Sequence, residues 1–151
     1  MSRKSAWTGI IALGTLGSLG VHSAARAAGP VTTDSLAGPG RFAVGITTVT
    51  VVDPKRSTLA SGTFPGSSVR TLVTDVYYPA ASGTPGDVVR DAPLDARDGR
   101  FPLIVFAHGS GANRTVYPTT LAHLAGHGYV LAAPDFPLTS SPIFFTSGDS
   151  R

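Results

Sequence analysis

The sequence predicts one α/β domain, in which an antiparallel hairpin precedes parallel strands that a single helix connects. Segments 41–53 and 69–79 are rich in β-branched residues and alternate in polarity, which indicates two half-exposed strands. Two nearly continuous apolar runs follow at 103–107 and 129–135, as expected for strands that are buried on both faces. A helical pattern beginning near Pro118 lies between these runs. Strand, helix and strand in this order form a parallel crossover, which we expect to be right-handed.

The first 27 residues (1–27) have the layout of a secretory signal peptide. Arg3 and Lys4 provide a positive start, the apolar run 7–21 follows, and Ala-Arg-Ala at 25–27 is a small-x-small cleavage site. An uncleaved membrane anchor is the alternative. The apolar run is shorter than the roughly 20 residues that a membrane span needs, and it holds four glycines. We therefore expect a secreted, extracellular or periplasmic protein without a stable membrane span.

Composition and charge exclude several classes of function. Three basic residues of the signal segment account for the net charge of +3, so the remaining chain is neutral and offers no basic face to a nucleic acid. The absence of cysteine excludes a disulfide framework, a thiolate nucleophile and a cysteine metal site within this chain. All nine acidic residues are aspartates, so any carboxylate that acts as an acid or base must be an aspartate.

Two connecting segments are predicted to have no regular structure. Residues 28–40 are rich in Gly, Pro, Ser and Thr, so we expect an extended lead-in. Residues 80–100 hold several glycines and prolines before a charged cluster, so we expect a surface loop. The domain proper is assigned to residues 41–151.

The loop after the first apolar strand carries the pattern with the clearest chemical meaning, "HGSG" at 108–111. Ligands bind at the carboxyl edge of parallel sheets, where such a loop would lie. Glycines allow a sharp turn and a close approach of other atoms, and free backbone N–H groups can face a developing negative charge. A plain tight turn explains the same four residues, so this pattern alone leaves both interpretations open.

Three longer stretches carry a resemblance to a known family. "VRTLVTDVYYPA", "FPLIVFAHGSGANR" and "LAHLAGHGYVLAAPDFP", in this order and spacing, resemble the amino-terminal part of α/β-hydrolases. They are most similar to secreted bacterial hydrolases of the platelet-activating factor acetylhydrolase, dienelactone hydrolase and polyester hydrolase types. The resemblance covers about residues 42–139. It implies the amino-terminal portion of an α/β-hydrolase fold, hydrolysis of esters and no cofactor.

The resemblance assigns roles to the residues of the "HGSG" loop. In the family, the loop after the third strand supplies one N–H group of the oxyanion hole. Ser110 is the matching residue, and its backbone N–H would take that role while His108, Gly109 and Gly111 shape the loop. The family's nucleophile lies in Gly-x-Ser-x-Gly, and no serine of this chain has glycines two positions before and two after it. The resemblance therefore does not extend to the nucleophile, acid or base.

The missing elbow predicts a truncated α/β-hydrolase domain. From Ser140 onward the sequence no longer follows the family's pattern, so we expect a fragment or a change of reading frame after about Thr139. By the same resemblance, the strand at 103–107 lacks its second neighbour. An unpaired apolar edge favours aggregation, so we expect the isolated piece to be unstable or to associate. The sequence does not define an oligomeric state.

Arg114 and three phenylalanines are weaker candidates for substrate binding. Arg114 follows the glycine loop and could contact a carboxylate or phosphate, although a solvated arginine is favoured. Phe136, Phe144 and Phe145 could line an acyl pocket, although ordinary packing is favoured.

His123, His127 and Asp135 are interpreted as structural residues. The two histidines are four positions apart, as in a zinc site on one helix face. The metalloprotease pattern needs a glutamate after the first histidine, but Leu124 stands there, so no metal is predicted. Asp135 ends the second apolar strand, where a structural capping role is favoured over a catalytic one.

These observations favour a secreted serine-type hydrolase of carboxylic esters. Acetyl-phospholipids, polyesters and short-chain esters all remain open as substrates. Two alternatives are a non-catalytic secreted binding or structural module on the same sheet, and a dienelactone-type hydrolase whose cysteine nucleophile lies outside these residues.

Overall fold

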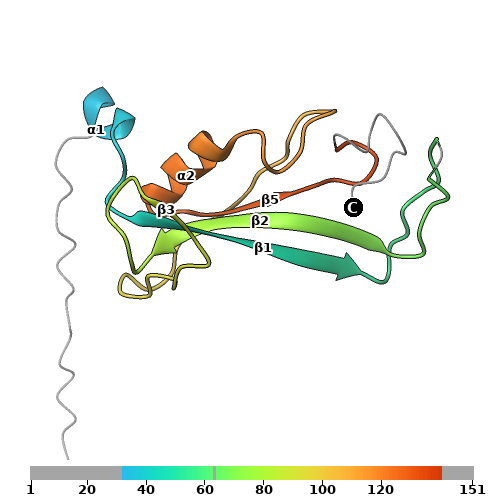
Figure 1. The fold of residues 1–151 in the computed structure, drawn as a ribbon, viewed down its shortest axis with the longest axis horizontal. Helices are drawn as coiled ribbons and strands as arrows, with labels where there is room; N and C mark the ends of the chain where they lie inside the picture. Colours follow the sequence, from blue (N-terminus) through green and yellow to red (C-terminus); the bar gives the residue numbers. More distant parts are fainter. Residues whose placement is uncertain (1–31, 63, 141–151) are drawn as a thin grey trace, which may run out of the picture. The chain divides into compact units, whose positions relative to one another are not determined.

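A five-stranded mixed sheet forms the centre of the computed structural model, which describes residues 32–62 and 64–140. The predicted signal peptide and the candidates Phe144 and Phe145 lie outside the described residues. The strands follow the order β3-β1-β2-β5-β4 (Figure 1). In chain order the elements are α1 (Thr33–Ala37), β1 (Ala43–Asp53), β2 (Arg70–Ala80), β3 (Val88–Arg90), β4 (Leu103–Val105), α2 (Pro118–Gly126) and β5 (Val130–Pro134).

The predicted antiparallel hairpin is confirmed. β1 and β2 pair along their whole length, from Ala43 opposite Ala80 to Asp53 opposite Arg70. Alternation sends successive side chains of each strand to opposite faces of the sheet. This long pair is the platform against which the crossover packs, because β2 also pairs with β5.

The predicted parallel crossover is also confirmed. β4 and β5 pair in parallel, and α2 connects them. Pro118 occupies the start of α2, where its missing N–H costs no hydrogen bond. The helix ends at Gly126, and Gly128 then turns the chain with a φ of 99°. This short return places the carboxyl ends of β4 and β5 at the same edge of the sheet.

The core lies between α2 and one face of the sheet. Leu121 and Ala125 of α2 are fully buried and pack in one cluster with Tyr77, Leu131 and Ala133. Burial of a leucine side chain contributes about 1.5–3 kcal/mol, so the helix is held mainly by this contact. The arrangement fixes where the loops after β4 and β5 leave the sheet.

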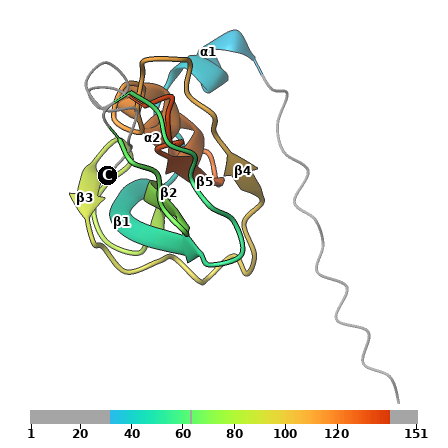
Figure 2. The same cartoon turned by 90° about the vertical axis from the view of Figure 1, so that its right-hand side faces the viewer.

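The expected burial of the first apolar strand on both faces is wrong. Ile104 packs against the core, but Leu103 and Val105 are 63% and 64% exposed. α2 covers the other face, and no described helix covers theirs. β4 also lies at an edge of the sheet, opposite β3, as Figure 2 shows. The predicted apolar edge is therefore present among the described residues.

Two segments expected to be irregular contain short elements. Thr33–Ala37 in the expected extended lead-in forms α1, because Thr32 and Ser35 cap each other's backbone N–H groups. The expected surface loop 80–100 contains β3, which pairs in parallel with β1. It also contains Asp95, which is only 1% exposed. β3 is three residues long, too short for its alternation to be recognised in the sequence.

Candidate active site

The "HGSG" loop leaves the sheet at the carboxyl end of β4 as a tight turn. The Phe106 N–H still donates to Ala132, and the Ala112 N–H then donates to the Gly109 carbonyl at 3.0 Å. Gly111 has a φ of 76°, a conformation that strains any residue with a β-carbon. Position 109 does not require glycine for its backbone conformation. A β-carbon there would meet no atom of the described residues within 4 Å. The space beside Gly109 is therefore open.

Ser110 lies exposed at the tip of this turn. Among the described residues, no acceptor is within hydrogen-bond range of its backbone N–H. The hydroxyl likewise has no hydrogen-bond partner among the described residues, and the two ring nitrogens of His108 contact Gly109 and Ser140 instead. In this arrangement Ser110 can therefore donate a hydrogen bond from its backbone N–H.

His108 ties the loop to the segment that follows β5. Its Nδ1 donates to the Gly109 carbonyl at 2.8 Å, and its Nε2 accepts the Phe136 N–H at 3.3 Å. Ser140 Oγ lies 3.1 Å from the same Nε2 and donates to the Phe136 carbonyl. Both ring nitrogens thus have partners, which leaves neither placed to take a proton from Ser110.

A second contact joins the two loops. The Gly111 N–H donates to the Thr139 carbonyl at 2.8 Å. Thr139 is itself held by bonds from its N–H and hydroxyl to the Phe136 carbonyl. The Phe136 ring, a candidate for substrate binding, lies half-buried 5.5 Å from the His108 ring. The loops after β4 and β5 therefore form one connected unit.

Arg114 pairs with two buried aspartates and is not the solvated side chain favoured by the sequence. Its Nη1 donates to Asp135, and its Nε lies 3.3 Å from Asp75 Oδ1. Its backbone N–H donates to Asp135 Oδ1 at 2.7 Å. Asp75 and Asp135 are each 4% exposed, so unpaired charges there would be costly. Arg114 is engaged with these carboxylates, and Asp135 closes the end of β5.

Asp75 is a residue that the sequence analysis missed. Thr48 donates to Asp75 Oδ1 at 2.6 Å, and Arg90 donates to the Thr48 hydroxyl at 3.3 Å. The sequence does contain a signal for it. Asp75 lies two positions before Tyr77 in an alternating strand, so the two side chains share the inward face. A carboxylate on an apolar face requires a partner, and Arg114 provides it.

His123, in the last turn of α2, and His127, the residue after the helix ends, lie side by side with ring centroids 4.6 Å apart. Nε2 of His127 is 3.3 Å from the Gly38 carbonyl oxygen. Between residues 32 and 140, residue 63 excepted, no group of three histidine or carboxylate side chains could hold a metal ion. These histidines therefore contact each other and the backbone.

Asp95 is the buried acid of the segment between β3 and β4. The Arg97 guanidinium donates three hydrogen bonds to the two carboxylate oxygens, and the Arg97 backbone N–H adds a fourth. These hydrogen bonds lower the pKa of Asp95 from 3.8 to about 2. The contact of this segment with β2 is made by the backbone, since the Asp95 N–H donates to the Pro79 carbonyl.

A mixed sheet with one parallel crossover and a His-Gly loop at its carboxyl edge defines an α/β-hydrolase-like fold. The structure is similar to that of a ferulic acid esterase from Streptomyces cinnamoneus, with a TM-score of 0.54 and 23% sequence identity. The superposition covers 70% of this chain and 37% of the esterase. This likeness supports the fold.

The chain belongs to the family described as platelet-activating factor acetylhydrolase, isoform II. The family's sequence model matches residues 67–146, which is more than half of the chain and includes the "HGSG" loop, Asp75, Arg114 and Asp135. The Cavia porcellus platelet-activating factor acetylhydrolase is 34% identical over 76 residues, which cover 50% of this chain. The Canis lupus familiaris enzyme is 53% identical over 34 residues, or 22% of this chain. These matches span only 15% and 8% of the relatives' own lengths.

Proposed function

We propose that this chain carries the oxyanion-binding loop of a secreted serine-type hydrolase of carboxylic esters. Membership of an acetylhydrolase family supports the reaction class. The observation that carries the proposal is the Ser110 N–H, which is exposed and has no acceptor among the described residues. A donor fixed in advance costs no reorganisation when negative charge develops, which is how oxyanion holes lower reaction barriers.

The neighbouring contacts support a loop of fixed shape. His108 joins the loop to Phe136 and Ser140, Gly111 joins it to Thr139, and Arg114 joins it to Asp135. None of these bonds uses the Ser110 N–H. We assign His108, Gly109 and Gly111 to shaping the loop, with Gly109 leaving room beside the donor.

The reaction then follows ordinary acyl transfer. A serine in a Gly-x-Ser-x-Gly elbow, which these 151 residues do not contain, attacks the ester carbonyl carbon while a base takes its proton. The π electrons move to the carbonyl oxygen, and the Ser110 N–H and an N–H beside the nucleophile bind the resulting oxyanion. Collapse expels the alkoxide, which is protonated to the alcohol. Water then attacks the acyl-enzyme in the same way and releases the acid. No cofactor takes part.

The substrate and location belong to the same proposal. Acetyl-phospholipids, short-chain esters and polyesters share the ester carbonyl that this loop would polarise. Phe136, half-buried beside His108, is the described apolar residue placed to touch an acyl group. Secretion rests on the predicted signal peptide at 1–27. No helix of the described residues is long and apolar enough to cross a membrane.

The alternative is a non-catalytic secreted module built on the same sheet. It is favoured by one observation, which is that no serine of the chain lies in a nucleophile elbow. A dienelactone-type hydrolase with a cysteine nucleophile similarly needs a residue that this chain lacks.

Sequencing and expressing the downstream reading frame separates these functions. We expect a Gly-x-Ser-x-Gly elbow in one downstream frame, and hydrolysis of p-nitrophenyl acetate by the protein that includes it. Changing the elbow serine to alanine should abolish that activity, and the 151-residue chain alone should show none. Hydrolysis by the 151-residue chain that a serine-reactive inhibitor abolishes would contradict the assignment of the nucleophile. An elbow of Gly-x-Cys-x-Gly would favour the dienelactone type, and no elbow in any frame would favour the non-catalytic module.

A further inference from the structure

His108 joins the loops after β4 and β5 through a half-buried ring whose two nitrogens have different kinds of partner. Nδ1 lies 2.8 Å from the Gly109 carbonyl oxygen, which can only accept a hydrogen bond. Nε2 lies 3.3 Å from the backbone nitrogen of Phe136, whose N–H can only donate one. The two partners therefore require a neutral ring with its proton on Nδ1, because a second proton on Nε2 would face the Phe136 N–H.

Ser140 offers a protonated His108 ring a different partner. The Ser140 side chain is buried, and its Oγ lies 3.1 Å from Nε2 of His108. The same hydroxyl donates to the Phe136 carbonyl at 2.9 Å. A hydroxyl oxygen that donates one hydrogen bond still has lone pairs with which it can accept another. A proton on Nε2 would therefore break the bond from the Phe136 N–H and replace it by a bond to Ser140.

The charged side chains around the two loops do not pair with the ring. Arg114 and Asp135 are the charged residues of segments 106–117 and 135–140, and they bind each other. Asp75 of β2 binds Arg114 as well. Tyr117, which can also titrate, packs edge-on against an apolar ring. No described carboxylate forms an ion pair with His108, so its hydrogen-bond partners distinguish its two protonation states.

Ser110 lies between two residues that hold the "HGSG" loop to the segment after β5. His108, two positions before it, accepts the Phe136 N–H, and Gly111, one position after it, donates to the Thr139 carbonyl at 2.8 Å. A change of partner at His108 alters the first contact and leaves the second. An oxyanion donor is effective because it is fixed in advance, so a loop held less firmly is a poorer oxyanion site.

We propose that His108 is a pH-dependent positioning residue, which fixes the oxyanion-binding loop against Phe136 while its ring is neutral and releases Phe136 when the ring takes up a proton. Ester hydrolysis at this site is accordingly regulated by acidification, with the loop fixed at the higher pH. The hydrogen bonds of His108 carry the change of partner by themselves, and only its effect on hydrolysis rests on the proposed function.

NMR spectroscopy of the full 151-residue chain, between about pH 8 and about pH 5, tests the change of partner. At the higher pH the ring-nitrogen signals of His108 should show the proton on Nδ1. As the ring takes up its second proton, the protection of the Phe136 amide against hydrogen exchange should fall about two- to tenfold, as expected for one hydrogen bond. The Ser110 amide signal should shift over the same pH range. The Leu121 amide, which donates to the Tyr117 carbonyl at the start of α2, should stay protected.

Two variants test whether the ring of His108 causes this response. His108→Gln keeps an acceptor oxygen near the position of Nε2 and cannot titrate, so it should protect the Phe136 amide equally at both pH values. Ser140→Ala removes the partner of the protonated ring, so the Phe136 amide should lose its protection at a lower pH than in the unaltered chain. Ser140→Ala also replaces His108→Gln as the test should that variant fail to fold.

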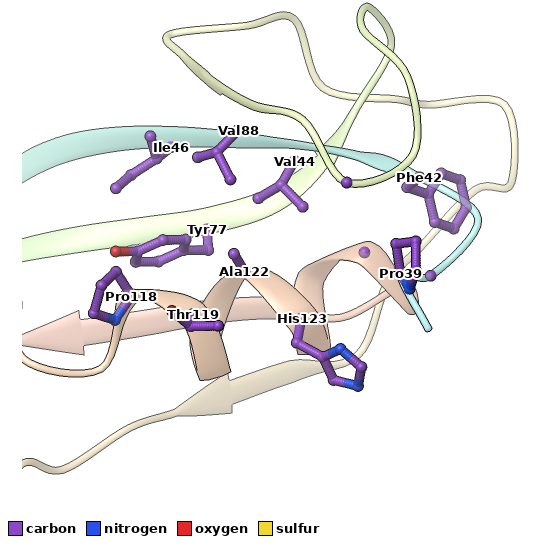
Figure 3. A pocket seen from close by; sticks show the side chains of 13 residues that line it. Pro39, Phe42, Val44, Ile46, Tyr77, Val88, Pro118, Thr119, Ala122 and His123 are labelled. Atoms are coloured by element: carbon purple, nitrogen blue, oxygen red, sulfur yellow. The ribbon is translucent and has the colours of Figure 1, made fainter. Parts of the chain in front are cut away.

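His123→Gln is the matched control. Figure 3 shows His123 on α2, beside a cavity of about 470 Å³ that this helix forms with β1 and β3. No residue of the loops after β4 and β5 lines that cavity. The control should therefore leave the pH response of the Phe136 amide unchanged.

The proposal would be overturned by a proton on Nε2 of His108 at the higher pH, or by the same loss of Phe136 protection in His108→Gln. A Ser110 signal that does not move, or a parallel loss of protection at Leu121, would overturn it as well. None of these readouts needs catalysis. Absence of ester hydrolysis by the elbow-containing protein would contradict the proposed function and leave the change of partner at His108 in place.

Discussion

The two faces of the sheet differ in how far the described residues cover them and exclude solvent. On the face beneath α2, Tyr77, Leu131 and Ala133 are buried to 2% exposure or less. On the opposite face, Leu103 and Val105 of β4 remain 63% and 64% exposed. Residues from one apolar run, Ile104 and its two neighbours, thus lie in very different surroundings.

This difference shows which interactions hold the candidate site. Asp75 lies on the same face as Tyr77, and it anchors Arg114 together with Asp135. The segment that follows the "HGSG" loop is therefore tied through Arg114 to the face beneath α2. The exposed face contributes nothing to those contacts, so changes on the two faces should have separate consequences.

Leu121→Ala and Leu103→Ala test the comparison with the same chemical change on each face. Leu121 is fully buried, so its truncation should lower the free energy of unfolding by about 2–5 kcal/mol. Leu103 is 63% exposed, so its truncation should change stability by less than about 0.5 kcal/mol. Urea denaturation measures both values. Equal losses would show that the exposed face is covered in solution.

Asp135→Ala tests whether the buried pair anchors the loop. The change leaves the Arg114 N–H and part of its guanidinium without an acceptor, so we expect a loss of about 3 kcal/mol. Asp98→Ala is the control, because Asp98 forms an exposed pair with Arg41 that should contribute about 0–1 kcal/mol. Urea denaturation of both variants measures the change in the free energy of unfolding. A similar small decrease in each variant would contradict an anchoring role for Asp135.

Val105→Lys tests the apolar edge. A lysine on an edge strand discourages pairing with another chain, and Val105 is 64% exposed, so the change removes no core contact. We expect a smaller associated fraction in sedimentation velocity, with the unfolding midpoint nearly unchanged. Val116→Lys, at an exposed valine outside the sheet, should leave association as it is. Equal effects from both lysines would show that net charge alone controls association.

Arg97→Gln tests the buried Asp95 through pH. Because the folded pKa of about 2 lies below the ordinary 3.8, this carboxylate stabilises the fold above about pH 4 and loses its contribution as the pH falls toward 2. The variant should raise the pKa of Asp95 and flatten the loss of stability in that range. Carboxyl NMR titration measures the pKa, and Arg100→Gln should leave it unchanged. An unchanged pKa in the Arg97 variant would reject the assigned cause.

Elements with several periods of pattern were predictable from the sequence, and shorter ones were not. β1 and β2, each 11 residues long, roughly alternate in polarity, with Leu72 of β2 as a partial exception, and α2 is marked by Pro118 and two glycines. β3 spans three residues, and α1 depends on one mutual cap between Thr32 and Ser35. Neither contains enough pattern to be recognised. The apolar run at β4 showed which residues can be buried, but not which element would cover them.

The residues of the candidate site likewise fall into those that the sequence could predict and those that it could not. The "HGSG" turn is local in sequence, so its position after a strand could be predicted. The partners of Arg114 are 21 and 39 positions away along the chain, so only the folded sheet brings them together. For the same reason, the sequence favoured a solvated Arg114 and did not single out Asp75.

The backbone N–H of Ser110 in the elbow-containing protein provides the most direct test of the central claim. Ser110→Ala removes the hydroxyl and keeps the N–H, so it should hydrolyse p-nitrophenyl acetate at nearly the unaltered rate. Replacing the amide at Ser110 by an ester removes the N–H and keeps the side chain, so kcat should fall about 100- to 1,000-fold. A large loss with Ser110→Ala and none with the amide-to-ester change would contradict a backbone role for this loop.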